Sequence, residues 1–229
     1  MIRILGFDAD DTLWHNESIF EHAHEAYRRL LAKYHPAEEV NRVLYATEMR
    51  NIPLYGYGVK GYMLSCVEAA IELTKGAISG QEIREILATG QRMLAHPVEL
   101  LPDVTTVVPG LAREFRLLLI TKGDLHHQEK KITESGLAAH FHAIEIVSEK
   151  DPAAYDRVLR RHGVAPAEFA MIGNSLKSDI LPVLGLGGAG VHVPYHITWA
   201  HEEAEVPATE KRFRRIARLG ELPAILPSL

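Results

Sequence analysis

The sequence contains a single cysteine, Cys66, among 229 residues, so no disulfide can form within the chain. It has no apolar run near the ~20 residues that a membrane-spanning helix needs. It also has no excess of positive charge: the formal net charge is -5 at pH 7. We therefore expect neither a nucleic-acid nor a membrane partner. No basic segment or cleavage signal precedes the first apolar run, so we expect no signal peptide and a cytoplasmic protein.

The composition is that of an ordinary globular protein, with 47% hydrophobic and 24% charged residues. A chain of this length can form one large domain, or a core with an insertion. Cys66 lies on an apolar helical pattern with no recognisable base beside it, which predicts core packing rather than a reactive thiol. The sequence carries no signal for an oligomeric state.

The most informative segment is the start of the chain. The apolar run Ile2–Phe7 predicts a buried strand, and it is followed at once by Asp8, Asp10 and Asp11. Ligands of open α/β sheets lie beyond the carboxyl ends of the strands. Three crowded carboxylates there favour a hard cation such as Mg²⁺, which prefers oxygen ligands. Taken alone, these acids favour a metal site no more than they favour the ordinary explanation, a solvated loop or a helix N-terminus.

Residues of about 15–100 show helical spacing of apolar residues and no strand signal. The segment Ser79–Glu82 has the spacing of a capping box at the start of a helix. A break rich in Gly and Tyr, Leu54–Gly61, separates two of the expected helices. This block interrupts the strand pattern and therefore predicts an inserted helical domain.

Beyond the block, strands and helices alternate. Alternation of this kind predicts a parallel sheet with right-handed crossovers, so we expect an α/β fold with a Rossmann-like core. The core comprises residues 1–14 and 101–229, and the all-helical block 15–100 is a cap over the strand ends. The expected later strands are Leu117–Ile120, Ala143–Val147, Phe169–Ile172, Val191–Val193 and a short one near Arg214–Ile216.

Four loops should converge at one end of this sheet, and their residues suit phosphoryl transfer. Asp8 can act as a nucleophile, and Asp10 can protonate the leaving oxygen and later deprotonate water. Thr121 can donate to phosphoryl oxygens, while Lys150 supplies a positive charge. Asp179 can complete or orient a metal shell. The polar residues concerned are Asp8, Asp10, Thr121, Lys150, Asn174 and Asp179.

Four motifs in register resemble those of the haloacid dehalogenase-like hydrolase superfamily, whose members are mostly phosphatases. The resemblance covers nearly the whole chain. The helical insertion between the first and second motifs resembles one of the family's cap types. The motifs are Phe7-Asp8-Ala9-Asp10-Asp11-Thr12-Leu13, then Thr121 after a strand, Lys150 before Asp151-Pro152, and Gly173-Asn174-Ser175 with Asp179.

The resemblance implies a Mg²⁺-dependent phosphatase that hydrolyses a small phosphorylated metabolite through an aspartyl-phosphate at Asp8. It implies that the backbone amides of Lys122 and Gly123 assist Thr121 in binding phosphate. The implied metal ligands come from Asp8, Asp10, Asn174 and Asp179.

Two positions depart from the family pattern. Position 11 is more often Gly, so Asp11 is either a turn residue or an extra charge near the metal. Asn174 stands where the family usually has Asp as a metal ligand. An Asn carbonyl can still coordinate Mg²⁺ but brings no charge, so either Asn174 or Asp179 is the direct ligand.

Each later residue also has a structural explanation. Thr121 could begin the next helix, Lys150 could be a solvated lysine, and Asp179 could be an acid on a helix face. Asp151 followed by Pro152 suits the N-cap and first position of a helix. It is the coincidence of all four motifs that favours catalysis.

Three other functions remain open. A 2-haloacid dehalogenase of the same superfamily would lack the acid at position 10 and need no metal. A phospho-acceptor signalling domain would carry its acid on a later strand, without a large helical insertion. A non-catalytic binder is suggested only by Asn174.

Two glycine-rich segments, Gly56–Gly61 and Gly185–Gly190, match the spacing of the dinucleotide fingerprint. That fingerprint works only after a strand and at the start of a helix, and neither segment meets this condition. The first segment is instead either a substrate loop or a flexible turn. His126 and His127 could touch substrate or lie on the surface.

Overall fold

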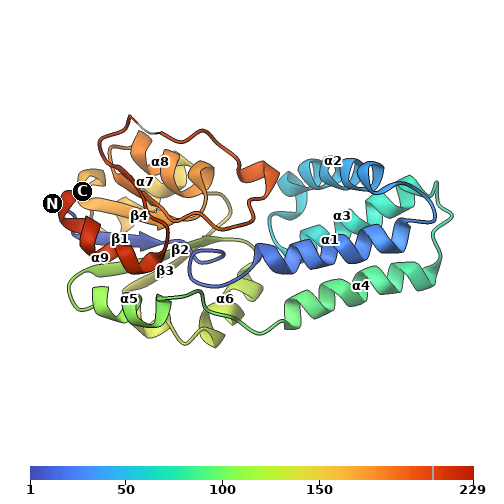
Figure 1. The fold of residues 1–229 in the computed structure, drawn as a ribbon, viewed down its shortest axis with the longest axis horizontal. Helices are drawn as coiled ribbons and strands as arrows, with labels where there is room; N and C mark the ends of the chain where they lie inside the picture. Colours follow the sequence, from blue (N-terminus) through green and yellow to red (C-terminus); the bar gives the residue numbers. More distant parts are fainter. Residues whose placement is uncertain (208) are drawn as a thin grey trace. The chain divides into compact units, whose positions relative to one another are not determined.

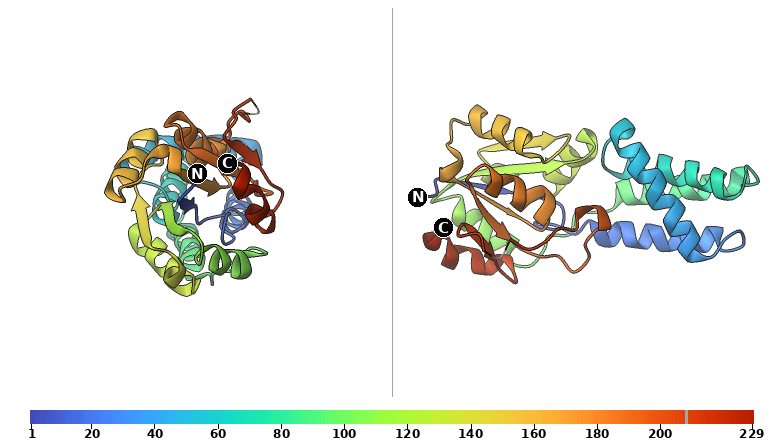
Figure 2. Two further views of the ribbon diagram at one scale, coloured as in Figure 1. Left: turned by 90° about the vertical axis from the view of Figure 1, so that its left-hand side faces the viewer. Right: turned by 90° about the horizontal axis from the view of Figure 1, so that it is seen from above.

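The computed structural model describes residues 1–207 and 209–229, which form two compact units. The sheet unit contains Met1–Glu17, Val98–Lys122 and Gln128–Leu229. The helical unit contains Ser18–Pro97 and Gly123–His127. Both units are drawn in Figures 1 and 2. In the described part of the chain, no helix is both long and apolar enough to cross a membrane.

The sheet unit is built on six parallel strands in the order β3-β2-β1-β4-β5-β6 (Figure 1). The expected α/β, Rossmann-like fold class is therefore confirmed. The order runs outward from β1 in both directions, which makes its carboxyl end the topological switch point where ligands bind. The strands are β1 (Ile4–Phe7), β2 (Arg116–Lys122), β3 (Ala143–Val147), β4 (Phe169–Gly173), β5 (Ala189–His192) and β6 (Phe213–Arg215).

Helices cover both faces of this sheet, which explains why β1 is apolar on both sides. Leu5 and Phe7 pack in one core with α5 (Val104–Leu111) and α9 (Leu222–Ile225). Ile4 points to the opposite face, toward α7 (Pro152–Arg161) and α8 (Leu181–Gly185). The two helical layers lie on either side of the strands in Figure 1.

Helix α6 (Leu125–Glu134) directly follows β2. Its residues from Gln128 onward belong to the sheet unit, and Ile132 packs in the same core as Leu5. This anchoring brings the polar side chains of α6 near the carboxyl end of the sheet.

The helical unit has a separate core formed by four helices. Cys66 is 2% exposed within it, as predicted, and burial raises the pKa of its thiol. The predicted capping box is also confirmed: Ser79 Oγ accepts from the Glu82 amide, and Glu82 Oε2 accepts from the Ser79 amide. The helices are α1 (Glu17–Leu31), α2 (Ala37–Tyr55), α3 (Val59–Leu73) and α4 (Gly80–Ala95).

The helix boundaries differ from expectation in two places. Helix α2 extends to Tyr55, into the expected break Leu54–Gly61, and it includes Pro53, which lies in the last turn and costs only one backbone hydrogen bond. The chain then turns at Gly56, whose φ of 72° favours glycine. Helix α5 was not expected, because Pro109 and Gly110 weaken its helical signal. Its three buried valines hold it against the sheet.

Gly6 permits close packing at the centre of the sheet, and we predict that Gly6→Ala destabilises the protein. A Cβ atom there would lie 2.4 Å from the ring of Phe169. Overpacking of this kind costs ~1–3 kcal/mol of unfolding free energy. Gly80→Ala is the matched control, because a Cβ at Gly80 meets nothing within 4 Å. Urea unfolding of both variants checks the prediction, and equal midpoints would contradict it.

Candidate active site

Asp8 follows β1 at the switch point of the sheet. Its amide donates to the carbonyl of Ile172 in β4 over 2.9 Å, which fixes the backbone where two central strands end. The residue is only 6% exposed. The pKa of its carboxyl is raised to about 7. Burial is the largest cause, the attraction of Lys150 opposes it, and repulsion from Asp179 adds to the rise.

Lys150, in the loop between β3 and α7, joins two carboxylates. Its Nζ donates to Asp8 Oδ1 and, over 2.7 Å, to Asp179 Oδ1. Burial alone would lower the pKa of this ammonium, but Asp179 and Asp8 raise it well above its usual value. Lys150 therefore stays charged and is not a solvated lysine. Asp151 caps α7 as predicted: Asp151 Oδ1 accepts from the Ala154 amide over 2.6 Å.

Asp179 lies in a π-helical turn, Leu176–Ile180, after β4. It is 1% exposed, and both carboxylate oxygens are engaged: Oδ1 by Lys150 and Oδ2 by the Ser175 amide at 3.0 Å. Gly173 makes room for it, since a Cβ there would lie 2.2 Å from Asp179 Oδ2. Asp179 is thus arranged to orient Lys150.

Thr12 links the first and fourth motifs. Its Oγ1 lies 3.0 Å from Asp8 Oδ2 and 3.3 Å from Asn174 Oδ1, and it accepts from the Asn174 amide over 3.0 Å. The carboxylate is the closer and charged acceptor for its single proton. Thr12 belongs to the first motif, but its role was not predicted from the sequence.

Asp10 is held by three side chains. Trp14 Nε1 donates to Oδ1 over 2.6 Å, Gln128 Nε2 to Oδ2 over 3.2 Å, and Lys131 Nζ to both oxygens at 2.6 and 2.8 Å. Burial would raise the pKa of Asp10, but the attraction of Lys131 and these hydrogen bonds lower it. Sequence analysis missed Gln128 and Lys131. Their i, i+3 spacing on one helix directly after Thr121 is the signal that could have found them.

Thr121, near the end of β2, is 1% exposed and accepts from Gln128 Nε2 over 2.6 Å. The side chain of Lys122 ion-pairs with Glu202 at 2.6 Å and donates to Ser178 Oγ over 2.9 Å. Burial would raise the pKa of Glu202, but Lys122 and hydrogen bonds lower it to about 2. The contact of the Lys122 side chain was not expected.

Asp11 is a turn residue. Its φ of 62° lies in the left-handed region that favours glycine, which explains why the family more often has Gly there. Its carboxylate accepts from the Asn16 and Glu17 amides at 2.8–3.0 Å and so caps the start of α1. Burial raises the pKa of this carboxyl to about 8.

Gly123, His126 and His127 belong to the helical unit. Gly123 has a φ of 144°, and the His127 amide donates to Asp124. In the segment Gly56–Gly61, residues 56–58 connect α2 to α3 and the remainder forms the start of α3. No strand precedes it, and Gly185–Gly190 leads from a helix into β5, so neither segment has the context of a dinucleotide site.

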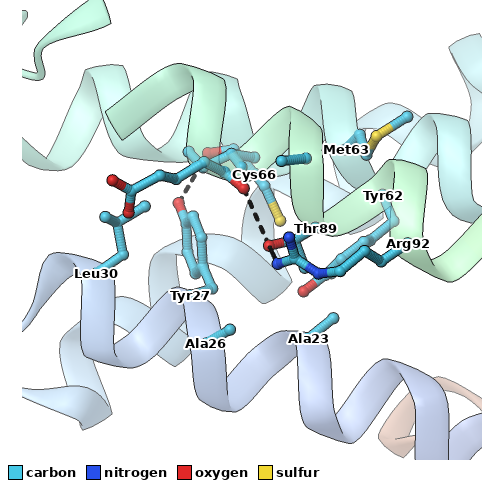
Figure 3. A pocket seen from close by; sticks show the side chains of 12 residues that line it. Ala23, Ala26, Tyr27, Leu30, Tyr62, Met63, Cys66, Thr89 and Arg92 are labelled. Atoms are coloured by element: carbon cyan, nitrogen blue, oxygen red, sulfur yellow. Dashed lines mark hydrogen bonds between the residues drawn. The ribbon is translucent and has the colours of Figure 1, made fainter. Parts of the chain in front are cut away.

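A cavity of about 170 Å³ lies within the helical unit, between α1, α3 and α4 (Figure 3). Tyr27, Tyr62 and Arg92 are among its lining residues. None of the predicted site residues lines it.

Across the residues that the structure describes, no three His, Cys, Asp or Glu side chains are grouped so as to hold a metal ion. The oxygen atoms best placed to share a metal ion are the Asp8 carboxylate and the side-chain carbonyl of Asn174, both in contact with Thr12 Oγ1. Mg²⁺ is commonly bound by one or two carboxylates together with substrate phosphate and water. This donor set fits that pattern, although Asp179 is engaged elsewhere.

The model of the haloacid dehalogenase-like hydrolase family matches residues 2–185. The chain belongs to this family. It is 42% identical to a haloacid dehalogenase-like family hydrolase from Xanthomonas campestris, with a TM-score of 0.89 over 99% of this chain and 91% of that one. A curated relative, N-acylneuraminate-9-phosphatase of Mus musculus, is 27% identical over 100% of this chain and 95% of its own length.

Other members of the family share the fold at lower identity. A 2-haloacid dehalogenase from Pseudomonas syringae is 22% identical, with a TM-score of 0.60 over 99% of each chain. As a haloacid dehalogenase-like hydrolase, the chain is an enzyme, and its curated relatives are phosphatases.

We predict that Asp11→Asn stabilises the protein increasingly as pH rises. The folded-state pKa, about 8, lies above the ordinary 3.8, so the folded state keeps a proton that the unfolded chain has released. The unfolding free energy of the wild type therefore falls between about pH 4 and pH 8 through this group. Asn keeps the cap and tolerates positive φ.

The expected gain is small at pH 4 and more than ~1 kcal/mol at pH 8, where one pKa unit is worth ~1.4 kcal/mol. Urea unfolding of both proteins across this range measures it. A gain that is the same at every pH would show that Asp11 is ionised in the folded protein.

Proposed function

We propose that the protein is a Mg²⁺-dependent phosphatase that hydrolyses a small phosphorylated metabolite through an aspartyl-phosphate. The observation that carries the proposal is the Asp8 carboxylate. This carboxylate is buried at the switch point of the sheet, where it contacts both Lys150 and Thr12. The curated relatives of the chain are phosphatases, which supports the same chemistry.

In the first step, Asp8 attacks phosphorus and the bond to the leaving oxygen breaks, while Asp10 gives that oxygen a proton. In the second, Asp10 takes a proton from water, which attacks the aspartyl-phosphate and releases phosphate and Asp8. Asp10 is ionised in the substrate-free protein. An arriving phosphate dianion would raise its pKa and so load it with the proton it must donate.

Lys150 keeps its proton throughout. It orients Asp8 and offsets the charge that gathers on the transferring group. Thr121 Oγ1 accepts a hydrogen bond from Gln128, which orients the hydroxyl group. Because that bond does not use the hydroxyl proton, Thr121 can donate this proton to a phosphoryl oxygen. The backbone amides of Lys122 and Gly123 are proposed to donate there as well.

Mg²⁺ would be held by Asp8 and Asn174, with Asp10 close by and Asp179 acting through Lys150. When bound, it would neutralise phosphate charge and polarise phosphorus. The buried charges support a cation: among the described residues, the ion pairs of Asp8, Asp10 and Asp179 are with two ammonium groups, those of Lys150 and Lys131. The helical unit is proposed to serve as the cap that selects the substrate.

A dehalogenase would use the same nucleophile, but Asp10 would have no task in displacing a halide. Hydrolysis assays separate the two functions. The panel contains N-acylneuraminate 9-phosphate, sugar phosphates, p-nitrophenyl phosphate and 2-chloropropionate, each with Mg²⁺ and with a chelator. Phosphate release that needs Mg²⁺ supports the proposal, and chloride release without metal would overturn it.

We predict that Asp8→Asn abolishes phosphate release and leaves the fold intact, because an amide is a poor nucleophile. The loss should exceed ~10⁴-fold, the upper end of what one acid–base group typically contributes. Circular dichroism checks the fold, and mass spectrometry of trapped wild-type enzyme should place the phosphoryl group on Asp8. Normal turnover by the folded variant would exclude this mechanism.

We predict that Asn174→Asp tightens Mg²⁺ binding and lowers the stability of the metal-free protein. The new carboxylate adds a full charge where the amide offers a dipole, and it repels Asp8 and Asp179 when no metal is present. Calorimetric titration with Mg²⁺ and thermal unfolding in chelator measure the two effects. An unchanged or weaker affinity would place Asn174 away from the metal.

A further inference from the structure

Helix α6 presents two buried polar side chains to the carboxyl end of the sheet. Gln128 and Lys131 lie three residues apart, and so on one face of the helix. They are 2% and 8% exposed. Neither belongs to the four motifs of the sequence.

Lys131 contacts both carboxylate oxygens of Asp10. Its Nζ lies 2.6 Å from Oδ1 and 2.8 Å from Oδ2, and 3.3 Å from Asn16 Oδ1. Trp14 Nε1 adds a bond to Oδ1 at 2.6 Å. With both oxygens held from several directions, rotation of the carboxylate is blocked.

Gln128 connects Asp10 to Thr121, the residue of the second motif. Its Nε2 lies 3.2 Å from Asp10 Oδ2, 2.6 Å from Thr121 Oγ1 and 3.2 Å from the Lys122 carbonyl. One amide therefore sets the spacing between the proposed acid–base group and the proposed phosphate donor.

The folded core does not require an ammonium at this place. Burying a charged pair carries a large desolvation cost, and apolar residues of similar volume often serve stability as well or better. A lysine in this position therefore points to a role in the site rather than in packing.

We propose that Lys131 and Gln128 are positioning residues for the acid–base step: they hold the Asp10 carboxylate in the direction of the leaving oxygen. The inference rests on the proposed phosphatase function. Proton transfer needs the carboxylate within hydrogen-bond reach of that oxygen, and a misplacement of ~1 Å can cost about 100-fold in rate.

The test compares Lys131→Met with Lys130→Met. Lys130 is the next residue of the same helix, and its described ion pair is with Glu134 at 3.7 Å, away from Asp10. Each variant is assayed on an alkyl phosphate, whose leaving oxygen needs a proton, and on p-nitrophenyl phosphate, whose leaving group does not. Thermal unfolding of each variant checks its fold.

Lys131→Met should lower kcat/KM, which reports the reaction up to departure of the leaving group, by about 10- to 100-fold on the alkyl phosphate and by much less on p-nitrophenyl phosphate. KM should change little, and Lys130→Met should match the wild type. In an Asp10→Asn background, Lys131→Met should cause no further loss, because the group it positions is already gone.

Equal losses on both esters, or a full additional loss in the Asp10→Asn background, would overturn the inference in favour of a general structural role. So would a Lys131→Met enzyme as active as Lys130→Met. If Lys131→Met does not fold, Gln128→Met makes the same comparison between esters, and equal losses there overturn the inference as well. A folded wild type inactive on every phosphate ester would overturn the proposed function instead.

Discussion

The Lys150 ammonium is the interaction on which the carboxyl end of the sheet depends. It lies between two carboxylates that are almost wholly removed from water, Asp8 after β1 and Asp179 after β4. Without a cation, two such carboxylates could not both stay ionised at this separation. Lys150, which follows β3, therefore allows the acids that follow the adjacent strands β1 and β4 to share one site.

The same solution is repeated around this edge of the sheet. Asp10 is matched by Lys131 from α6, and Glu202 by Lys122 at the end of β2. In every case the acid and the base come from segments far apart in the sequence. Charge pairing thus ties the loops together where hydrophobic packing has ended, and each pair holds its side chains in one orientation.

Much of the fold could be predicted because its signals are local. The apolar run before Asp8, the strand–helix alternation and the capping box at Ser79 each depend on neighbouring residues. Helix α5 escaped prediction because Pro109 and Gly110 oppose helix formation locally, and contacts with the sheet overcome that preference.

Within the candidate site, the motifs predicted which residues would be gathered, and the structure does bring Asp8, Lys150, Asn174 and Asp179 together. Their partners could not be predicted in the same way. Pairing of Lys131 with Asp10 spans 121 positions in the chain, and no local pattern records it. For Asp11 the sequence left two alternatives open, a turn residue or an extra charge near the metal, and its positive φ decides for the turn residue.

Gly6 has a consequence for how this sequence can vary. The ring of Phe169 on β4 fills the space that a side chain on β1 would need. A larger residue at position 6 can be accommodated only if position 169 loses volume at the same time. The two positions, 163 residues apart, are therefore expected to covary. Among related chains, a bulkier residue on β1 should be accompanied by a smaller one on β4.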